Sequence, residues 1–85
     1  MLHEGAAIID VRTREEFQGG HVAGSHNYPL QELQANIDEL RAMNKPLVLC
    51  CASGNRSGMA AQLLQQAQIE CVNGGGWMQV NALMN

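Results

Sequence analysis

The sequence contains few aromatic residues, few basic residues and no long apolar run. The aromatic residues are Phe17, Tyr28 and Trp77, so the core must be built mainly from aliphatic side chains. Only five of the 85 residues are Lys or Arg, and the net charge is −3, which argues against a nucleic-acid-binding surface. No apolar stretch reaches the roughly 20 residues needed to cross a bilayer. We therefore expect neither nucleic acid nor a membrane as a partner.

Length and composition predict one small folded domain spanning residues 1–85. Apolar residues make up 46% of the chain and charged residues 15%, which is typical of a globular protein. Residues Met1–Glu4 lack the basic and apolar segments of a secretory signal. We expect a cytoplasmic monomer, although a mature fragment of a periplasmic protein would have the same sequence.

The three cysteines favour a reactive thiol over a disulfide framework. Their number is odd, and Cys50 and Cys51 are adjacent, a spacing at which a disulfide is rare and strained. There is no CxxC motif and no Cys/His spacing typical of zinc ligands. We therefore predict no metal site.

In the first half of the chain, the pattern predicts one strand and two helices. The apolar run Ala6–Ile9 is typical of a buried strand. Thr13 and Glu16 form a capping-box pattern that predicts a short helix ending at Gly19. The loop that follows has room for a short strand near Val22. One helix over residues 30–43 is predicted from a stripe of apolar residues at Leu30, Leu33, Ile37 and Leu40.

The second half alternates strands and helices. Leu47–Cys50 has no polar member and predicts a strand buried on both faces. We then expect a helix over residues 56–67, a strand over 69–72, a turn over 73–76 and a last helix over 77–83. This order predicts an α/β fold with a parallel sheet covered by helices on both faces.

The stretch Cys51–Ser57 contains the residues most suited to chemistry. Cys51 ends a predicted parallel strand, at the sheet edge where ligands bind in open α/β folds. Backbone N–H groups of the small-residue loop and of the helix start can surround an anion there. Gly54 allows a tight turn, and Arg56 adds a permanent positive charge. We expect these features to lower the Cys51 pKa below the usual value of about 8.5 and to make the thiolate a nucleophile.

Four motifs occur in the order found in one known family. Cys51–Ser57 resembles the C-x-x-G-x-R active-site loop of the rhodanese family, and Ile9–Arg12 is similar to its I-D-V-R. Gly20–Ser25 resembles its G-H-I-x-G-A with two conservative changes, and Asn73–Trp77 its glycine-rich region before a tryptophan. In its shortness, the chain resembles the small phage-shock-protein-E type of this family. The resemblance implies a single rhodanese-like domain.

The resemblance also implies sulfur transfer without a metal or an organic cofactor. Cys51 would take the outer sulfur of a small anionic donor such as thiosulfate and form a persulfide. A thiol, cyanide or a sulfur-accepting protein would then remove that sulfur. The substrate-binding residues would be those of the loop after the nucleophile: Ala52, Ser53, Gly54, Asn55, Arg56 and Ser57. Asp10, Arg12 and His21 are predicted to be structural residues near the site, and Trp77 a core residue or pocket wall.

Two alternatives remain open at this stage. The domain could be a persulfide relay or binding module that passes sulfur to a partner protein. Counted from Cys50, the pattern Cys-x5-Arg-Ser instead resembles the loop of cysteine-dependent phosphatases and arsenate reductases. We favour Cys51, because Cys50 completes the apolar strand and Gly54 follows Cys51 by three residues.

Overall fold

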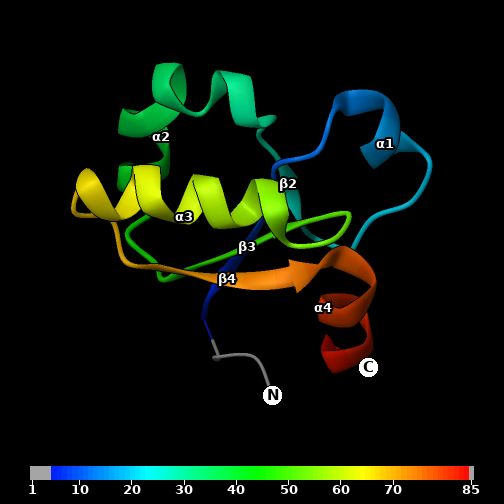
Figure 1. The fold of residues 1–85 in the computed structure, drawn as a ribbon. Helices are drawn as coiled ribbons and strands as arrows, with labels where there is room; N and C mark the ends of the chain where they lie inside the picture. Colours follow the sequence, from blue (N-terminus) through cyan, green and yellow to red (C-terminus); the bar gives the residue numbers. More distant parts are fainter. Residues whose placement is uncertain (1–4, 85) are drawn as a thin grey trace.

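The fold is built on a four-stranded parallel sheet. The computed structural model describes residues 5–84, so the expectation about a signal at residues 1–4 lies outside the described residues. The strands lie in the order β2-β1-β3-β4 (Figure 1). Their bounds are Ala7–Asp10 for β1, His26–Asn27 for β2, Leu47–Cys51 for β3 and Cys71–Gly76 for β4.

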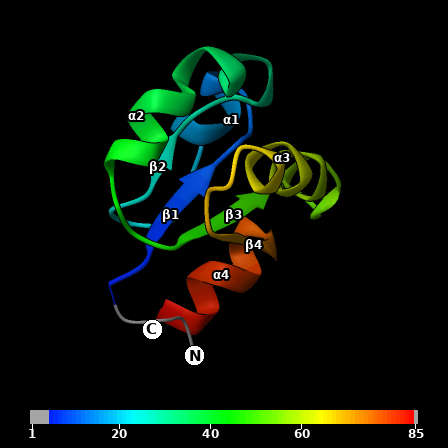
Figure 2. The ribbon, with the colours of Figure 1, turned by 90° about the vertical axis from the view of Figure 1, so that its left-hand side faces the viewer.

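Helices cover both faces of the sheet, which confirms the predicted fold class. Figure 2 shows α2 and α3 on one side of the strands and α4 on the other. The helices are α1 (Arg14–Gln18), α2 (Ile37–Ala42), α3 (Asn55–Gln66) and α4 (Trp77–Met84). Among the described residues, no helix combines the length and apolar character required to cross a bilayer.

The core has two parts, one on each face of the sheet, because successive strand side chains point in opposite directions. On the α2/α3 face, the largest fully buried side chains are those of Ile9, Leu33, Leu40, Leu47, Leu49 and Leu64. On the α4 face, the buried residues are Ile8, Val22, Val48, Cys50 and Val80. Cys51 therefore faces α3, whereas Cys50 faces α4.

The capping box predicted for α1 is confirmed. The Glu16 backbone N–H donates to the Thr13 hydroxyl at 3.2 Å, and the Thr13 N–H donates to the Glu16 carboxylate at 2.9 Å. Two of the free N–H groups at the helix start are thereby satisfied. The arrangement also fixes the position of the Glu16 carboxylate.

The continuous helix predicted over residues 30–43 is wrong. Two short 3₁₀ turns, Leu30–Glu32 and Gln34–Asn36, precede α2. The side-chain amide of Asn36 donates to the Glu32 carbonyl at 2.9 Å, and the Asn36 backbone N–H bonds to Leu33 at 2.9 Å. Asn competes in this way with regular helical hydrogen bonding. The apolar stripe is still used, because Leu33 and Leu40 are buried.

The short strand considered near Val22 lies instead at His26–Asn27. Val22 is a buried residue of the α4-side core. The strand β2 pairs with the end of β1, and the Asn27 side-chain amide donates to the Asp10 and Arg12 carbonyls at 3.0 Å each. A two-residue edge strand held by a polar side chain has no apolar pattern that a sequence reading could detect.

The glycines predicted to form a turn at residues 73–76 belong to β4. A β-bulge separates the pair Leu49–Asn73 from the pair Cys50–Gly75, which leaves Gly74 as the extra residue. A Cβ atom at Gly74 would lie 2.8 Å from Val48 Cγ1 and 3.0 Å from Val80 Cγ2. The glycines thus allow close packing of β4 against its neighbours.

We expect Gly74→Ala to lower the free energy of unfolding by about 1–3 kcal/mol, because the added methyl group would overpack the core beside Val48. Urea unfolding measures the change. Gly19→Ala is a matched control, since its Cβ would make only ordinary contacts and its φ of −74° suits alanine. Equal stability of the two variants would contradict the proposed packing role.

Candidate active site

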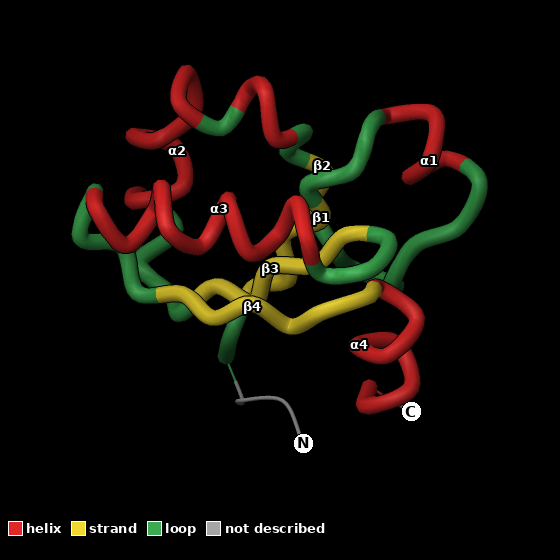
Figure 3. The backbone as a smooth tube through the Cα atoms, in the orientation of Figure 1, coloured by secondary structure: helices red, strands yellow, loops and turns green. Residues whose placement is uncertain are grey.

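The candidate site lies at the carboxyl end of β3. The loop from β3 to α3 passes beside the start of α4, as Figure 3 shows. Cys51 is the last residue of β3, and Gly54 precedes the first residue of α3. Gly54 has φ +100°, and a Cβ there would lie 3.3 Å from Gly75 Cα. Both the backbone conformation and the contact with β4 therefore favour glycine at this position.

Two backbone N–H donors and one hydroxyl group lie around the Cys51 sulfur atom. The Gly54 N–H donates to Sγ at 3.0 Å, and the Ser57 N–H does so at 3.4 Å. The Ser57 hydroxyl also lies 3.4 Å from Sγ. The Cys51 residue is 1% exposed. The sulfur therefore lies in a donor-lined cradle at the start of a helix, as the sequence predicted.

This cradle lowers the pKa of the Cys51 thiol to about 7. Burial opposes the shift, because it disfavours the charged form. The Ser57 hydroxyl, the Ser57 N–H and the N–H groups of Ser53 and Gly54 outweigh burial by stabilising the thiolate. The Cys51 thiol therefore ionises more readily than an ordinary cysteine, and no histidine partner among the described residues is needed for this.

The remaining loop residues contribute less directly. The side chains of Ala52, Ser53 and Asn55 are exposed. Ser53 contributes its backbone N–H to thiolate stabilisation. Among the described residues, the side-chain group in contact with the sulfur is therefore the Ser57 hydroxyl, whereas the other loop contacts come from the backbone.

Arg56 is held by a carboxylate that the sequence analysis did not assign to the site. Its Nη1 and Nη2 atoms donate to Glu16 Oε1 and Oε2 at 2.7 and 3.0 Å. The Arg56 charge still interacts with Cys51. Hydrogen bonds are nevertheless the causes that lower the Cys51 pKa, so the expected contribution of Arg56 is smaller than that of the cradle.

Asp10 and Arg12 form a buried ion pair between β1 and α1. The two residues are 0% and 4% exposed. Arg12 Nη2 donates to Asp10 Oδ2 at 2.8 Å and to the Gly20 carbonyl at 2.6 Å, and the guanidinium carbon lies 4.8 Å from the centre of the Trp77 ring. The pair thus links the end of β1 to the start of α4. Among the described residues, neither Asp10 nor Arg12 forms a hydrogen bond with the Cys51 sulfur.

His21 is exposed and interacts with α1. Its Nδ1 atom lies 2.7 Å from the Phe17 carbonyl, and its ring stacks on Phe17 with centroids 3.7 Å apart. These contacts hold the turn after α1. They are consistent with a structural residue.

Asn73 is a second residue that the sequence analysis did not assign to the site. Its Oδ1 atom accepts the Ser57 hydroxyl at 2.6 Å and the Gly75 N–H at 3.0 Å, and its Nδ2 atom donates to the Gly54 carbonyl at 3.0 Å. Asn73 therefore joins β4 to both residues that donate to the sulfur. In the sequence, the signal for Asn73 was its position as a polar residue directly after the strand predicted over residues 69–72.

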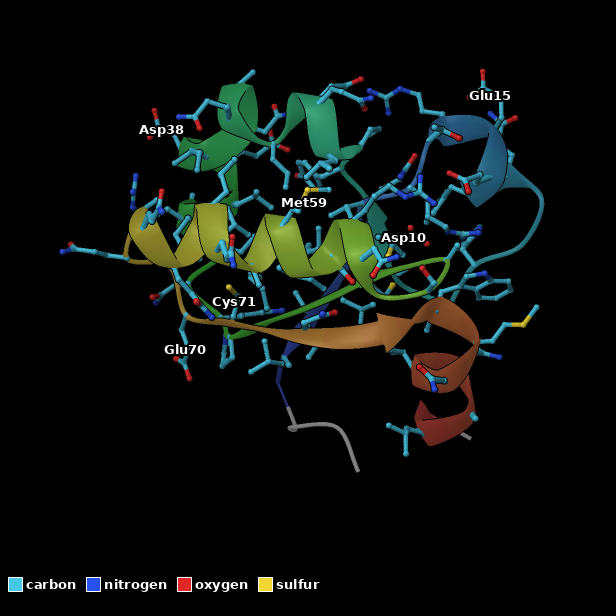
Figure 4. All side chains as sticks on the ribbon, in the orientation of Figure 1. Asp10, Glu15, Asp38, Met59, Glu70 and Cys71 are labelled. Atoms are coloured by element: carbon cyan, nitrogen blue, oxygen red, sulfur yellow. The ribbon has the colours of Figure 1, made fainter. Side chains whose placement is uncertain are left out.

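The other two thiols are separated from Cys51. Cys50 lies on the opposite face of the sheet, and burial together with the Asp10 charge raises the pKa of its thiol to about 12. Cys71 pairs with Leu47, four residues before Cys51 and thus about 13 Å away along the strand. Figure 4 shows Cys71 below α3, away from the end of the helix that follows the β3–α3 loop. The described residues contain no group of His, Cys, Asp and Glu side chains arranged to hold a metal ion.

The fold and the site define a small α/β protein with an activated cysteine at the end of a parallel strand. The family model for the rhodanese-like domain matches residues 1–82, and the chain belongs to this family. The family resemblance of the four motifs is thereby confirmed.

Similar proteins support this assignment. The chain is 46% identical over 61 residues to the uncharacterized protein YqhL of Bacillus subtilis, covering 72% of this chain and 48% of YqhL. It is 36% identical over 67 residues to the thiosulfate sulfurtransferase GlpE of Pseudomonas savastanoi, covering 75% of this chain and 59% of GlpE. A rhodanese-related protein of Thermoplasma volcanium superposes with a TM-score of 0.82 at 30% identity, covering 96% and 81% of the two chains. The chain thus spans about half the length of YqhL.

We expect Ser57→Ala to raise the Cys51 pKa by about one unit, because a hydrogen bond to a charged group contributes about 1.5 kcal/mol. The rate of iodoacetamide alkylation, measured against pH, should rise through about pH 7 in the wild-type protein and at higher pH in the variant. Ser53→Ala is the control, since Ser53 acts through its backbone. An unchanged profile for Ser57→Ala would exclude a role of the hydroxyl.

Proposed function

We propose that this protein is a sulfurtransferase that carries sulfur as a persulfide on Cys51. The observation that supports the proposal most strongly is the cradle of donors that lowers the pKa of this thiol. Membership of the rhodanese-like family and the similarity to GlpE support the same chemistry.

The reaction has two steps: a sulfur atom is first added to Cys51 and is then transferred to an acceptor. The Cys51 thiolate attacks the outer sulfur of thiosulfate, the sulfur–sulfur bond of the donor breaks, and its electron pair leaves with sulfite. Cys51 then carries a persulfide anion. Cyanide attacks the outer sulfur of this persulfide, thiocyanate leaves, and the Cys51 thiolate is restored. With a thiolate acceptor, the product is the acceptor's persulfide.

The acceptor must be external to the described part of the chain. Cys50 is adjacent in sequence, but its side chain is buried on the other face of the sheet. Cys71 is buried in another part of the α3-side core. Neither thiol is placed to attack a persulfide on Cys51 and form a disulfide. This arrangement favours sulfur transfer to another molecule over an internal redox switch.

A persulfide relay to a partner protein is the second candidate. The loop residues Ala52, Ser53 and Asn55 are exposed and uncharged, and the nearby Arg56 is paired with Glu16. Such a surface binds a small anion weakly, so a sulfur-carrying protein partner fits it as well as thiosulfate does. We do not propose phosphatase or arsenate reductase chemistry at Cys50, because that thiol faces the α4-side core and its pKa is raised.

We expect thiosulfate to add one sulfur atom to the protein and cyanide to remove it. Intact-mass measurement detects the adduct, and peptide mapping should place it on Cys51. Cys51→Ser should abolish both the adduct and thiocyanate formation, because a hydroxyl group does not form a persulfide.

Cys50→Ala is the matched control, and it should keep most of the activity because Cys50 serves as a core residue. An adduct located on Cys50 or Cys71 would refute the assignment. Hydrolysis of an aryl phosphate that depends on Cys50 and not on Cys51 would favour the phosphatase alternative. Transfer from a protein persulfide, with no adduct from thiosulfate, would favour the relay.

A further inference from the structure

The guanidinium group nearest the cradle is already paired. Arg56 and Glu16 form a two-point ion pair across 40 residues of sequence, between the first turn of α3 and α1. The two side chains are 32% and 37% exposed. The carboxylate thus occupies the position on Arg56 that an anionic sulfur donor would need, because sulfonate and carboxylate oxygens accept from the same fork of N–H groups.

Glu16 is itself fixed in place. Its Oε1 atom accepts from the Thr13 N–H at 2.9 Å and the Thr13 hydroxyl at 3.2 Å, besides Arg56 Nη1 at 2.7 Å. These contacts belong to the capping box of α1. The carboxylate therefore does not follow Arg56 if the guanidinium turns toward a ligand. An anionic sulfur donor that binds to Arg56 must break the two hydrogen bonds between Arg56 and Glu16, or it must share the guanidinium group with the Glu16 carboxylate.

The loop offers no other charge to replace Arg56. The residues from Cys51 to Asn55 carry no basic side chain, and Arg12 is buried in its pair with Asp10. The net charge of Glu16 and Arg56 together is zero, so their pairing cancels most of the attraction for an incoming anion.

We propose that Glu16 is a specificity-determining residue that holds Arg56 and thereby weakens binding of small anionic reagents at Cys51. Uncharged reagents, which do not need the guanidinium, are unaffected by this competition. The inference rests on the proposed function only where it concerns sulfur donors. The Glu16–Arg56 pair makes Cys51 selective against free anions such as thiosulfate, and it leaves the cradle that activates the thiol unchanged.

The test compares two alkylating reagents of similar size that react with Cys51. Iodoacetate is an anion and iodoacetamide is neutral, so the ratio of their rate constants reports how available Arg56 is to an anion. In Glu16→Gln, this ratio should rise at least about threefold, because one competing negative charge is removed. Gln also retains an oxygen that can accept the Thr13 N–H, so the capping box is kept.

Three further variants separate Glu16 from general charge effects. Glu15→Gln changes the net charge equally on the same helix, and Glu15 is exposed, so its ratio should stay near that of the wild type. Adding Arg56→Ala to Glu16→Gln should cancel the gain. Glu16→Asp keeps the net charge and withdraws the carboxylate by one methylene, so it should raise the ratio as well and provides a second measurement if Glu16→Gln unfolds.

Thiosulfate kinetics provide the link to sulfur transfer. The KM for thiosulfate should fall in Glu16→Gln while kcat changes less, because the released Arg56 acts on binding. An iodoacetate-to-iodoacetamide ratio that is unchanged, or equal in the Glu15 and Glu16 variants, would overturn the inference. A raised ratio without thiosulfate turnover in any variant would support the role of Glu16 and count against the proposed function.

Discussion

The site depends on the close packing of the glycine-rich end of β4 against β3 and the loop that follows it. A Cβ atom at Gly76 would lie 2.9 Å from the Ala52 carbonyl oxygen, and one at Gly54 would lie 3.3 Å from Gly75. This approach lets Asn73 bond to both Gly54 and Ser57. The backbone N–H donors around the Cys51 sulfur are therefore held from two sides, by α3 and by β4, and they are already in place when the thiolate forms.

The charges around this site differ from those expected for a cysteine with anionic substrates. The thiolate is stabilised by neutral groups, namely backbone N–H groups and one hydroxyl. The two nearby arginines are both paired, Arg12 with Asp10 in the interior and Arg56 with Glu16 near the surface. The buried pair connects β1, the Gly20 turn and Trp77, which makes it a structural element whose disruption would leave an uncompensated charge.

Much of this arrangement was predictable because it rests on local patterns. The apolar run before Cys51 indicated a fully buried parallel strand, and the strand is buried along its whole length. Thr13 and Glu16 indicated a capping box, which is present. The continuous helix predicted over residues 30–43 was wrong in its first half, since the Asn36 side chain competes for backbone groups in a way that apolar periodicity does not record.

The sequence by itself determined the α/β class, the position of Cys51 at the end of a strand and the loop that surrounds the sulfur. These features follow from hydrophobic periodicity and from the conformational needs of residues such as Gly54. The tertiary structure alone decided that Asn73 joins the site, that Glu16 binds Arg56, and that the face of the sheet with Cys51 is covered by α3. These contacts join residues up to 40 positions apart, and their partners are set by how the strands and helices pack, which no local pattern records.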